Sequence, residues 1–147
     1  LLNIIQPDIL YLGQKDAQQA IIIARMIKDL NFPVKVKIMP IVRENDGLAL
    51  SSRNIYLTKE ERSDAVVLSK ALRLAESLVN NGQRNGPVII NRMKQLIAKK
   101  KTAKIDYISI VDLDSLKPLK KISGNCLIAL AVSIGKTRLI DNIITYA

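Results

Sequence analysis

The chain has 147 residues, 48% of them hydrophobic, and its 23 Lys and Arg against 13 Asp and Glu give a formal net charge of +10. This apolar content excludes intrinsic disorder, and the length suffices for one hydrophobic core or two small ones. The longest apolar run, near residues 127–132, is far shorter than the ~20 residues of a membrane-spanning helix. The single cysteine, Cys126, excludes an internal disulfide, so we expect a globular cytoplasmic protein without a membrane segment.

Histidine is absent from the sequence. Its absence excludes His-ligated zinc, the Ser-His-Asp triad and histidine acid–base catalysis from this chain alone. The sequence also begins at Leu1 without a starting Met and without the basic region of a signal peptide. We interpret it as a fragment of a longer protein.

The first 42 residues carry the pattern of a parallel strand, a helix and a second strand. The apolar run 9–12 ends at Gly13, which is typical of a buried parallel strand. Asp16 and Gln19 have the spacing of a capping box, which predicts a helix from there to about residue 30. Residues 34–38 then alternate between apolar residues and lysines, which predicts a strand with one solvated face. The apolar face of the helix is predicted to consist of Ile23, Met26, Ile27 and Leu30.

A turn-forming cluster at residues 43–47 marks the best candidate for a domain boundary. Thr58 and Glu61 form a second capping-box pattern, and apolar residues then recur at helical spacing up to Asn81 and Gly82, which predicts one long amphipathic helix. The inward residues of that helix are predicted to be Ala65, Leu68, Leu72, Ala75 and Val79.

A third helix is predicted from Pro87, with its carboxyl end at the lysines 99–101, where cations complement the helix dipole. Its inward residues are predicted to be Ile90, Met93 and Ile97. Residues 105–111 and 126–134 have strand patterns, and a turn at 135–137 leads into a further strand. The expected fold is thus α/β plus α+β: the trailing strand-helix-strand of a Rossmann-like sheet in residues 1–42, then a small lobe of helices and antiparallel sheet in residues 43–147.

Residues 13–16 connect the carboxyl end of a predicted parallel strand to a helix amino terminus, where α/β sheets bind ligands. Backbone N–H groups there favour anions, Lys15 adds a charge suited to phosphate, and Asp16 is a candidate ligand for magnesium or for a ribose hydroxyl. The alternative is a plain capped helix with a solvated lysine. Gln19 has the same two interpretations, as a capping residue or as a substrate-binding residue.

Residues 50–54 place two hydroxyls and a guanidinium beside a glycine-bearing segment. Such a segment is suited to closing over phosphates as charge develops on them. The alternative is a polar loop that precedes a helix.

Five segments in this order and spacing resemble the pantoate–β-alanine ligase family, and the resemblance runs nearly end to end. They are residues 6–8 (QPD), 13–19 (GQKDAQQ), 40–44 (PIVRE), 46–54 (DGLALSSRN) and 138–142 (RLIDN). The family also has an amino-terminal half with a Rossmann-like nucleotide site and a His-x-Gly-His motif, which nothing here matches.

The resemblance implies a cytoplasmic homodimer that uses ATP and Mg²⁺ to adenylate pantoate and then joins it to β-alanine, giving pantothenate, AMP and pyrophosphate. It implies catalytic roles for Lys15, Ser51 and Arg53, pantoate binding by Gln19, and Asp16 as a candidate metal ligand. Gln14, Ala17 and Leu50 depart from the residues usual in the family, but none of these changes removes a charge that the chemistry needs. The ATP-binding residues implied are Gly13, Gln14, Lys15, Asp16, Val42, Leu50, Ser51, Ser52 and Arg53.

Without the amino-terminal half and its histidines, we expect this chain alone to be inactive. Two other functions stay open at this point. The positive charge and the lysines near residues 94–104 also fit a basic RNA-binding module, although aromatic residues make up only 3% of the chain, which leaves few base-stacking platforms. The chain would otherwise be a purely structural dimerisation domain. We expect no nucleic-acid partner and no membrane partner.

Overall fold

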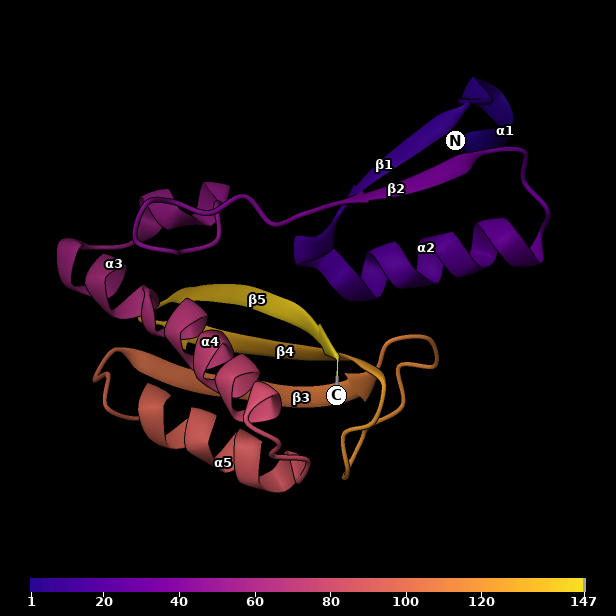
Figure 1. Ribbon diagram of the computed structural model, residues 1–147. Helices are drawn as coiled ribbons and strands as arrows, with labels where there is room; N and C mark the ends of the chain where they lie inside the picture. Colours follow the sequence, from indigo (N-terminus) through magenta and orange to yellow (C-terminus); the bar gives the residue numbers. More distant parts are fainter. Residues whose placement is uncertain (147) are drawn as a thin grey trace. The chain divides into compact units, whose positions relative to one another are not determined.

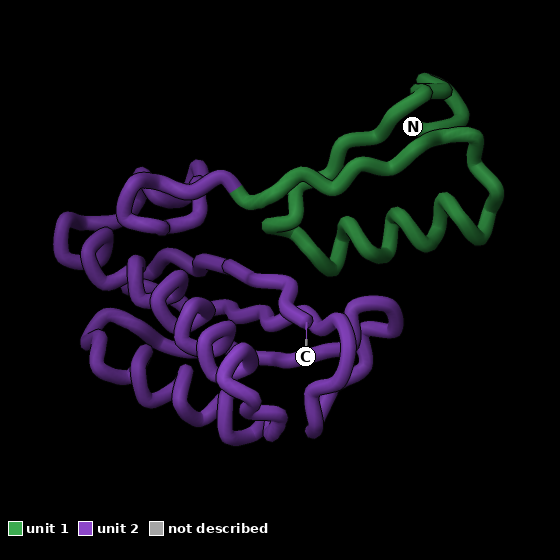
Figure 2. Tube along the Cα trace, in the orientation of Figure 1, with its two compact units in different colours: residues 1–41 green, residues 42–147 purple. Residues whose placement is uncertain are grey.

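A computed structural model describes residues 1–146, which form an α/β structure with one parallel and one antiparallel sheet (Figure 1). The chain divides into two compact units, Leu1–Ile41 and the described residues from Val42 onward (Figure 2). This division lies one residue from the boundary that the sequence predicts. No helix within residues 1–146 combines the length and the apolar character needed to cross a bilayer.

The first unit contains the predicted strand, helix and strand. Its two strands pair in parallel, from Ile9 opposite Lys35 to Gly13 opposite Met39. Parallel pairing requires a crossover between the strands, and the long helix of the unit supplies it. The elements are α1 (Leu2–Ile5), β1 (Ile9–Gly13), the 3₁₀ turn η1 (Gln14–Asp16), α2 (Ala17–Asp29) and β2 (Lys35–Met39).

The capping box predicted at Asp16 and Gln19 is wrong. Asp16 is the N-cap residue of α2, but its side chain makes no capping hydrogen bond. The chain reaches α2 through the 3₁₀ turn, so the Asp16 backbone lies at φ −95° and ψ 54° instead of the extended conformation of a typical N-cap. The same spacing of residue types therefore does not produce the same local geometry.

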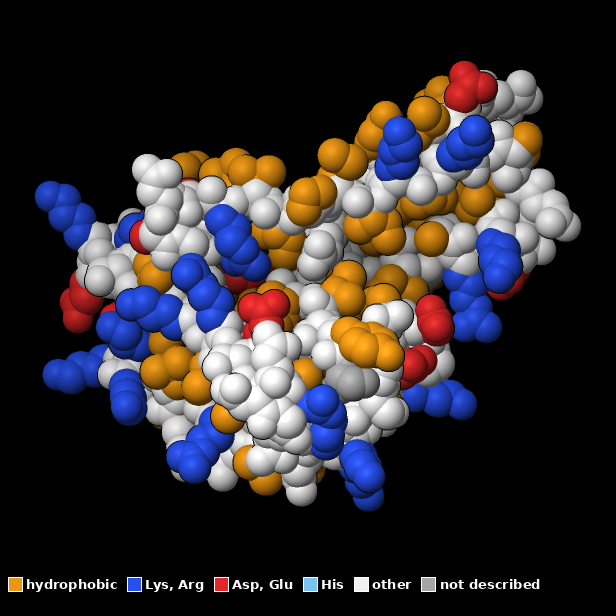
Figure 3. Space-filling model, viewed as in Figure 1, with side chains coloured by type: hydrophobic (Ala, Val, Ile, Leu, Met, Phe, Trp, Pro, Cys, Tyr) orange, Lys and Arg blue, Asp and Glu red, His pale blue; other side chains and the backbone are white. Residues whose placement is uncertain are grey.

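The apolar face of α2 is less covered than predicted. Ile27 is buried, but Met26 is 39% exposed and Leu30 63% exposed, and Ile38 of β2 is 45% exposed. A sheet of only two strands is narrow, so it covers only part of a 13-residue helix. The first unit consequently shows apolar side chains at its surface (Figure 3).

The second unit packs helices on one face of an antiparallel sheet with strand order β3-β4-β5 (Figure 1). Both pairings are antiparallel, as predicted, and Gly135 (φ 55°) and Lys136 form the turn between β4 and β5. The elements are the 3₁₀ helix η2 (Ser52–Tyr56), α3 (Lys59–Ala65), α4 (Val67–Asn80), α5 (Gly86–Ile97), β3 (Ala103–Asp112), β4 (Asn125–Ile134) and β5 (Thr137–Tyr146).

The hydrophobic core of the second unit lies between this sheet and the helices α4 and α5. Alternate residues of β4 point into it, and each large side chain buried there contributes on the order of 1.5–3 kcal/mol of transfer free energy. Cys126 lies in this core with no exposed surface, and burial raises the pKa of its thiol. The fully buried members include Leu68, Leu72, Ile89, Met93, Ile97, Ile128, Leu130, Val132 and Ile134.

Two details of the helices differ from the sequence prediction. The helix predicted after Thr58 is divided into α3 and α4 at Val66, where ψ of −18° tightens the turn and the Ser69 hydroxyl donates to the Val66 carbonyl oxygen at 3.0 Å. In α5 Met93 and Ile97 are buried as predicted, but the third fully buried side chain is that of Ile89, whereas Ile90 is only partly buried.

The carboxyl end of α5 is also shorter than predicted. The helix ends at Ile97, so the lysines 99–101 lie beyond it. The Lys100 ammonium instead pairs with the Asp64 carboxylate at 2.9 Å, and this hydrogen bond is the main cause that lowers the pKa of Asp64.

The capping box at Thr58 and Glu61 is confirmed. The Glu61 N–H donates to Thr58 Oγ1 at 3.3 Å, and the Thr58 N–H donates to Glu61 Oε2 at 2.8 Å. We expect Thr58→Ala to lower the free energy of unfolding by about 1 kcal/mol, because the Glu61 N–H in the first turn of α3 loses the hydroxyl that accepts its hydrogen bond. Denaturant unfolding measures this loss, with Lys59→Ala as the control in the same turn. Equal destabilisation by both substitutions would contradict a specific capping role.

Candidate functional site

The first group of predicted site residues lies where β1 ends and α2 begins. Gly13 is the last residue of β1, Gln14, Lys15 and Asp16 form the 3₁₀ turn, and Gln19 lies exposed in the first turn of α2. A Cβ atom added at Gly13 would meet nothing within 4 Å, so the backbone is open to close approach by a ligand. This is the position, at a strand carboxyl end and a helix amino terminus, where α/β sheets bind anions.

The second group lies on a hairpin formed by residues 42–50. The Glu44 N–H donates to the Leu48 carbonyl oxygen at 2.8 Å, and the Leu50 N–H donates to the Val42 carbonyl oxygen at 2.9 Å. Gly47 makes the turn at φ 94°, a conformation that favours glycine. The hairpin thereby brings Val42 beside Leu50, two of the residues that the resemblance implies in ATP binding.

Residues 50–53 leave this hairpin and begin η2. Ser51 is the N-cap of η2, and its Oγ accepts a hydrogen bond from the Arg53 N–H at 3.2 Å. Leu50 is 56% exposed, and Ser52 and Arg53 are exposed as well. The segment therefore presents hydroxyl and guanidinium groups to solvent on a backbone that is capped locally.

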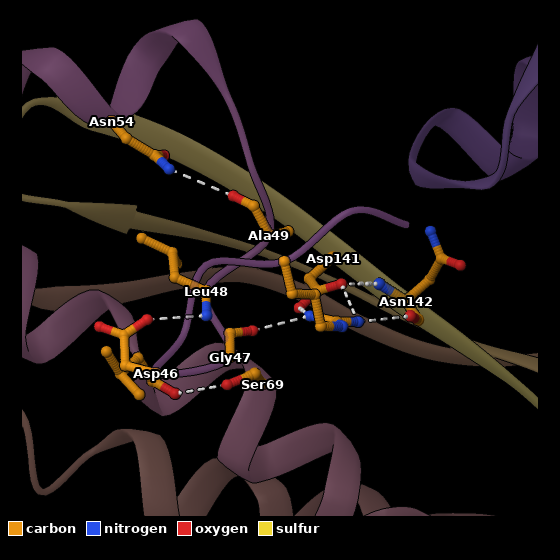
Figure 4. A network of polar contacts seen from close by, with 10 residues as sticks. Asp46, Gly47, Leu48, Ala49, Asn54, Ser69, Asp141 and Asn142 are labelled. Carbon is orange, nitrogen blue, oxygen red and sulfur yellow. Dashed lines mark hydrogen bonds and ion pairs between the residues drawn. The ribbon is translucent and has the colours of Figure 1, made fainter. Parts of the chain in front are cut away.

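A bidentate ion pair attaches this hairpin to the sheet (Figure 4). Arg43 donates from its two terminal nitrogens to Asp141 Oδ2 at 2.7 Å and Oδ1 at 2.9 Å, and also to the Gly47 carbonyl oxygen at 3.0 Å. The Asp141 side chain is 1% exposed and that of Arg43 27% exposed. The Asn142 N–H donates to Asp141 Oδ1 at 2.8 Å, so both carboxylate oxygens are hydrogen-bonded.

Arg62 of α3 holds the far end of the hairpin. It donates to Glu44 Oε2 at 2.6 Å and to Asp46 Oδ2 at 2.7 Å. Asn54 connects η2 to the same hairpin, since its amide nitrogen donates to Glu44 Oε1 at 2.9 Å and to the Ala49 carbonyl oxygen at 3.2 Å. Its Oδ1 is buried without a hydrogen-bond partner among the described residues. An open hollow of about 410 Å³ beside this cluster is lined by Glu44, Asn45, Asp46 and Arg62, none of them a predicted site residue.

The hydrogen bonds from Arg62 lower the pKa of both Glu44 and Asp46 below their ordinary values of 4.5 and 3.8. When folding lowers the pKa of a carboxyl group, the charged carboxylate stabilises the folded state at every pH above the unfolded-state pKa. This stabilisation is lost as the pH falls through the folded-state pKa. We therefore expect Arg62→Gln to lower the melting temperature at pH 7, and the difference from the unsubstituted chain to vanish as pH falls well below 4. Thermal melts between pH 7 and pH 3 measure it, and a difference that is constant with pH would contradict this account.

The structure thus assembles the predicted residues into two groups, Gly13 to Gln19 in the first unit and Val42 with residues 50–53 in the second. No cluster of three or more potential metal-ligating side chains occurs within residues 1–146. Asp16 is exposed and is the one carboxylate of the predicted set. A lone carboxylate fits a Mg²⁺ ion that is held mainly by the phosphates of a nucleotide, since Mg²⁺ is commonly bound in this way.

The sequence alone assigns no role to Arg43, Glu44, Asn54, Arg62 or Asp141, the residues that fix the hairpin. The available signal is Asp141 itself, a carboxylate within a predicted apolar strand, which requires a buried partner. Its partner lies 98 residues away in the chain, so no local pattern identifies it.

The comparisons with known proteins agree with this fold. The family model described as pantoate-beta-alanine ligase matches residues 1–144. The chain therefore belongs to the pantoate–β-alanine ligase family, a family of pantothenate-forming ligases. It is 53% identical over 144 residues to the pantothenate synthetase of Moorella thermoacetica and 52% identical over 147 residues to that of Caldicellulosiruptor bescii.

Solved structures give the same result. The crystal structure of pantothenate synthetase from Thermus thermophilus matches 99% of this chain with a TM-score of 0.92 and 36% identity. The pantoate-beta-alanine ligase from Francisella tularensis, complexed with beta-gamma ATP and beta-alanine, matches 97% with a TM-score of 0.65 and 32% identity.

The alignments cover different shares of the proteins compared. The alignment with the Moorella relative includes 98% of this chain and 51% of the relative, and the alignment with the Caldicellulosiruptor relative includes 100% of this chain and 52% of the relative. The structural matches cover 52% of the Thermus protein and 46% of the Francisella protein. The chain therefore spans about half the length of the curated relatives it matches.

Proposed function

We propose that this chain is the carboxyl-terminal part of an ATP-dependent ligase that adenylates pantoate and condenses it with β-alanine, giving pantothenate, AMP and pyrophosphate. The observation that carries the proposal is the open turn from Gly13 to Asp16 at a strand end and helix amino terminus, in a chain of this family. The Francisella tularensis relative, crystallised with an ATP compound and β-alanine, supports these two substrates.

Residues of each group are proposed to contact ATP. Lys15 supplies a positive charge to the phosphates, with backbone N–H groups of residues 13–16 around it. Ser51 and Arg53 supply a hydroxyl and a guanidinium donor as charge develops on the transferring phosphate, and Ser52 between them contacts ATP. Val42 contacts the adenine end, and Leu50, exposed beside it in the hairpin, is a further ATP-binding residue.

The first proposed step joins pantoate to the nucleotide. A pantoate carboxylate oxygen attacks the α-phosphorus of ATP, the bond to pyrophosphate breaks, and pantoyl adenylate forms. Lys15 and Arg53 stabilise the charge that accumulates on the phosphate oxygens, and Gln19 hydrogen-bonds pantoate. Asp16 is the residue of this chain that would hold a Mg²⁺ ion bound with ATP, and the ion would supply positive charge to the phosphates.

The second proposed step forms the amide. The amine of β-alanine attacks the acyl carbonyl carbon of pantoyl adenylate, the mixed anhydride bond breaks, AMP leaves, and the nitrogen loses a proton to solvent to give the neutral amide. In this proposal residues 1–42 are the trailing part of a Rossmann-like nucleotide-binding domain and residues 43–147 are the carboxyl-terminal α+β domain of a cytoplasmic homodimer. Because this chain has no histidine, the groups that complete the phosphate site come from the amino-terminal half, and the chain alone is inactive.

Neither alternative function gains a supporting observation. Lys and Arg side chains are spread over the visible surface of both units (Figure 3). Within the lysine-rich residues 94–104, Lys100 forms an ion pair with Asp64. The test of the proposal is pantothenate formation from ATP, pantoate and β-alanine by this chain together with the amino-terminal half of the Moorella thermoacetica relative. A pair that folds and associates but forms no pantoyl adenylate would refute it.

A further inference from the structure

The pair formed by Arg43 and Asp141 is unusual among the ion pairs of the described residues because one partner is almost fully buried. The Asp141 side chain is 1% exposed, compared with 12% for Asp64, the next most buried carboxylate of a described pair. Removing two charges from water costs about as much as their attraction returns, so buried pairs seldom add net stability over apolar residues. Stability alone therefore does not account for this pair.

The pair fixes the orientation of the Arg43 side chain relative to the sheet. The planar guanidinium of Arg43 makes two parallel bonds to the carboxylate and a third to the Gly47 carbonyl oxygen, which fixes its direction as well as its distance. Asp141 lies within β5, opposite the fully buried Leu130 of the central strand, so the carboxylate is attached to the three-stranded sheet of the second unit.

The hairpin backbone connects Arg43 to residues 50–53, so fixing Arg43 also restrains that segment. Arg43 pairs with Ala49 in an antiparallel bridge, and the Leu50 N–H bonds to the residue before Arg43. From the other side, the Asn54 amide binds the Ala49 carbonyl oxygen. The segment that carries Ser51 and Arg53 is thus flanked at both ends by groups tied to the strand that Arg43 anchors.

We propose that Arg43 and Asp141 are positioning residues, which hold residues 50–53 in the place where their hydroxyl and guanidinium groups meet the phosphates of ATP. This inference rests on the proposed function for its consequence in catalysis. In this proposal Arg43 and Asp141 act through the hairpin and not through direct contact with ATP or pantoate.

The test separates positioning from stability by replacing the pair with apolar residues. Arg43→Met with Asp141→Leu removes the fork and leaves no uncompensated charge. Asp64→Leu with Lys100→Met is the matched control, since it removes a partly buried pair of the same unit that does not contact the hairpin. Denaturant unfolding of the chain reports stability, and amide hydrogen exchange of residues 48–56 reports the order of the segment.

We expect the Arg43/Asp141 replacement to raise the exchange rate of residues 48–56, whereas the control replacement leaves it unchanged. With the amino-terminal half added, the first replacement is expected to slow pantoyl-adenylate formation by about 10- to 100-fold, as misplaced catalytic groups do, with the KM for pantoate little changed. The control replacement is expected to leave both constants close to those of the unsubstituted pair.

Unchanged exchange, or faster exchange with an unchanged adenylation rate, would overturn the positioning role while leaving the proposed function intact. If the double replacement does not fold, Arg43→Lys gives the same comparison, because it keeps the cation and removes the fork. Inactivity of the unsubstituted chain with its added half would instead count against the proposed function, and the exchange measurement would still report whether the pair orders the segment.

Discussion

The chain alone is expected to form no measurable pantothenate, and to become active when the amino-terminal half of the Moorella thermoacetica relative is supplied in trans. Adenylation needs groups that stabilise charge on the transferring phosphate, and here only Lys15, Ser51 and Arg53 are assigned to that task. A cation in a half-built site also faces water, where a charge interaction is much weaker than in a closed, dry site. Restoring the other half is therefore expected to recover both ATP binding and chemistry.

The measurement is product formation from ATP, pantoate and β-alanine, with each half alone and with both together. Omitting pantoate from the complete mixture is the control for adventitious ATP hydrolysis. Turnover by the isolated chain would show that it is not catalytically incomplete, and would contradict the expected role of the added half.

In the reconstituted enzyme, Lys15→Ala or Arg53→Ala is expected to slow pantoyl-adenylate formation on the order of a hundredfold or more. Each substitution removes a charged contact that is strongest in the transition state, so the loss falls on the rate of the chemical step. Pyrophosphate release under saturating ATP and pantoate measures it. Lys28→Ala and Arg92→Ala are the matched controls, since both residues are exposed, Lys28 lies in the last turn of α2 at the end away from Gln19, and Arg92 lies in α5.

Gln19→Ala gives a contrasting result within the same assay. Because Gln19 is proposed to contact pantoate and not the nucleotide, its loss should appear first as a raised KM for pantoate. A purely nucleotide-dependent defect in this variant, or a rate in Lys15→Ala and Arg53→Ala equal to that of the two controls, would contradict the assignment of roles.

Much of the fold could be predicted because it depends on local patterns. The parallel strand pair, the antiparallel sheet and the capping box at Thr58 each follow from residue spacing that the structure confirms. The capping box at Asp16 has comparable spacing and does not form, because a 3₁₀ turn precedes α2 and changes the backbone of the cap residue. A pattern of residue types predicts a cap only when the backbone before it is extended.

Other details depend on where an element begins or on distant contacts. Ile89 and Ile90 are adjacent and chemically identical, and both have helical spacing to the buried Met93, so only the packing of α5 against the rest of the core decides which of them is fully buried. Predicted site residues could be found by resemblance because they lie in short segments. Arg43 and Asp141 also lie in such segments, but their contact could not be predicted, because the fold brings together residues 98 positions apart.

The buried thiol of Cys126 can be used to measure how often the core of the second unit opens. It is the single cysteine of the chain, it has no exposed surface, and burial raises its pKa, so little thiolate is present and reagents cannot reach it. Its reaction with a thiol reagent therefore requires the packing between β4 and the helices to open. The labelling rate at one natural atom thus measures how often this core opens, without any probe being introduced and without a signal from the cysteine-free first unit.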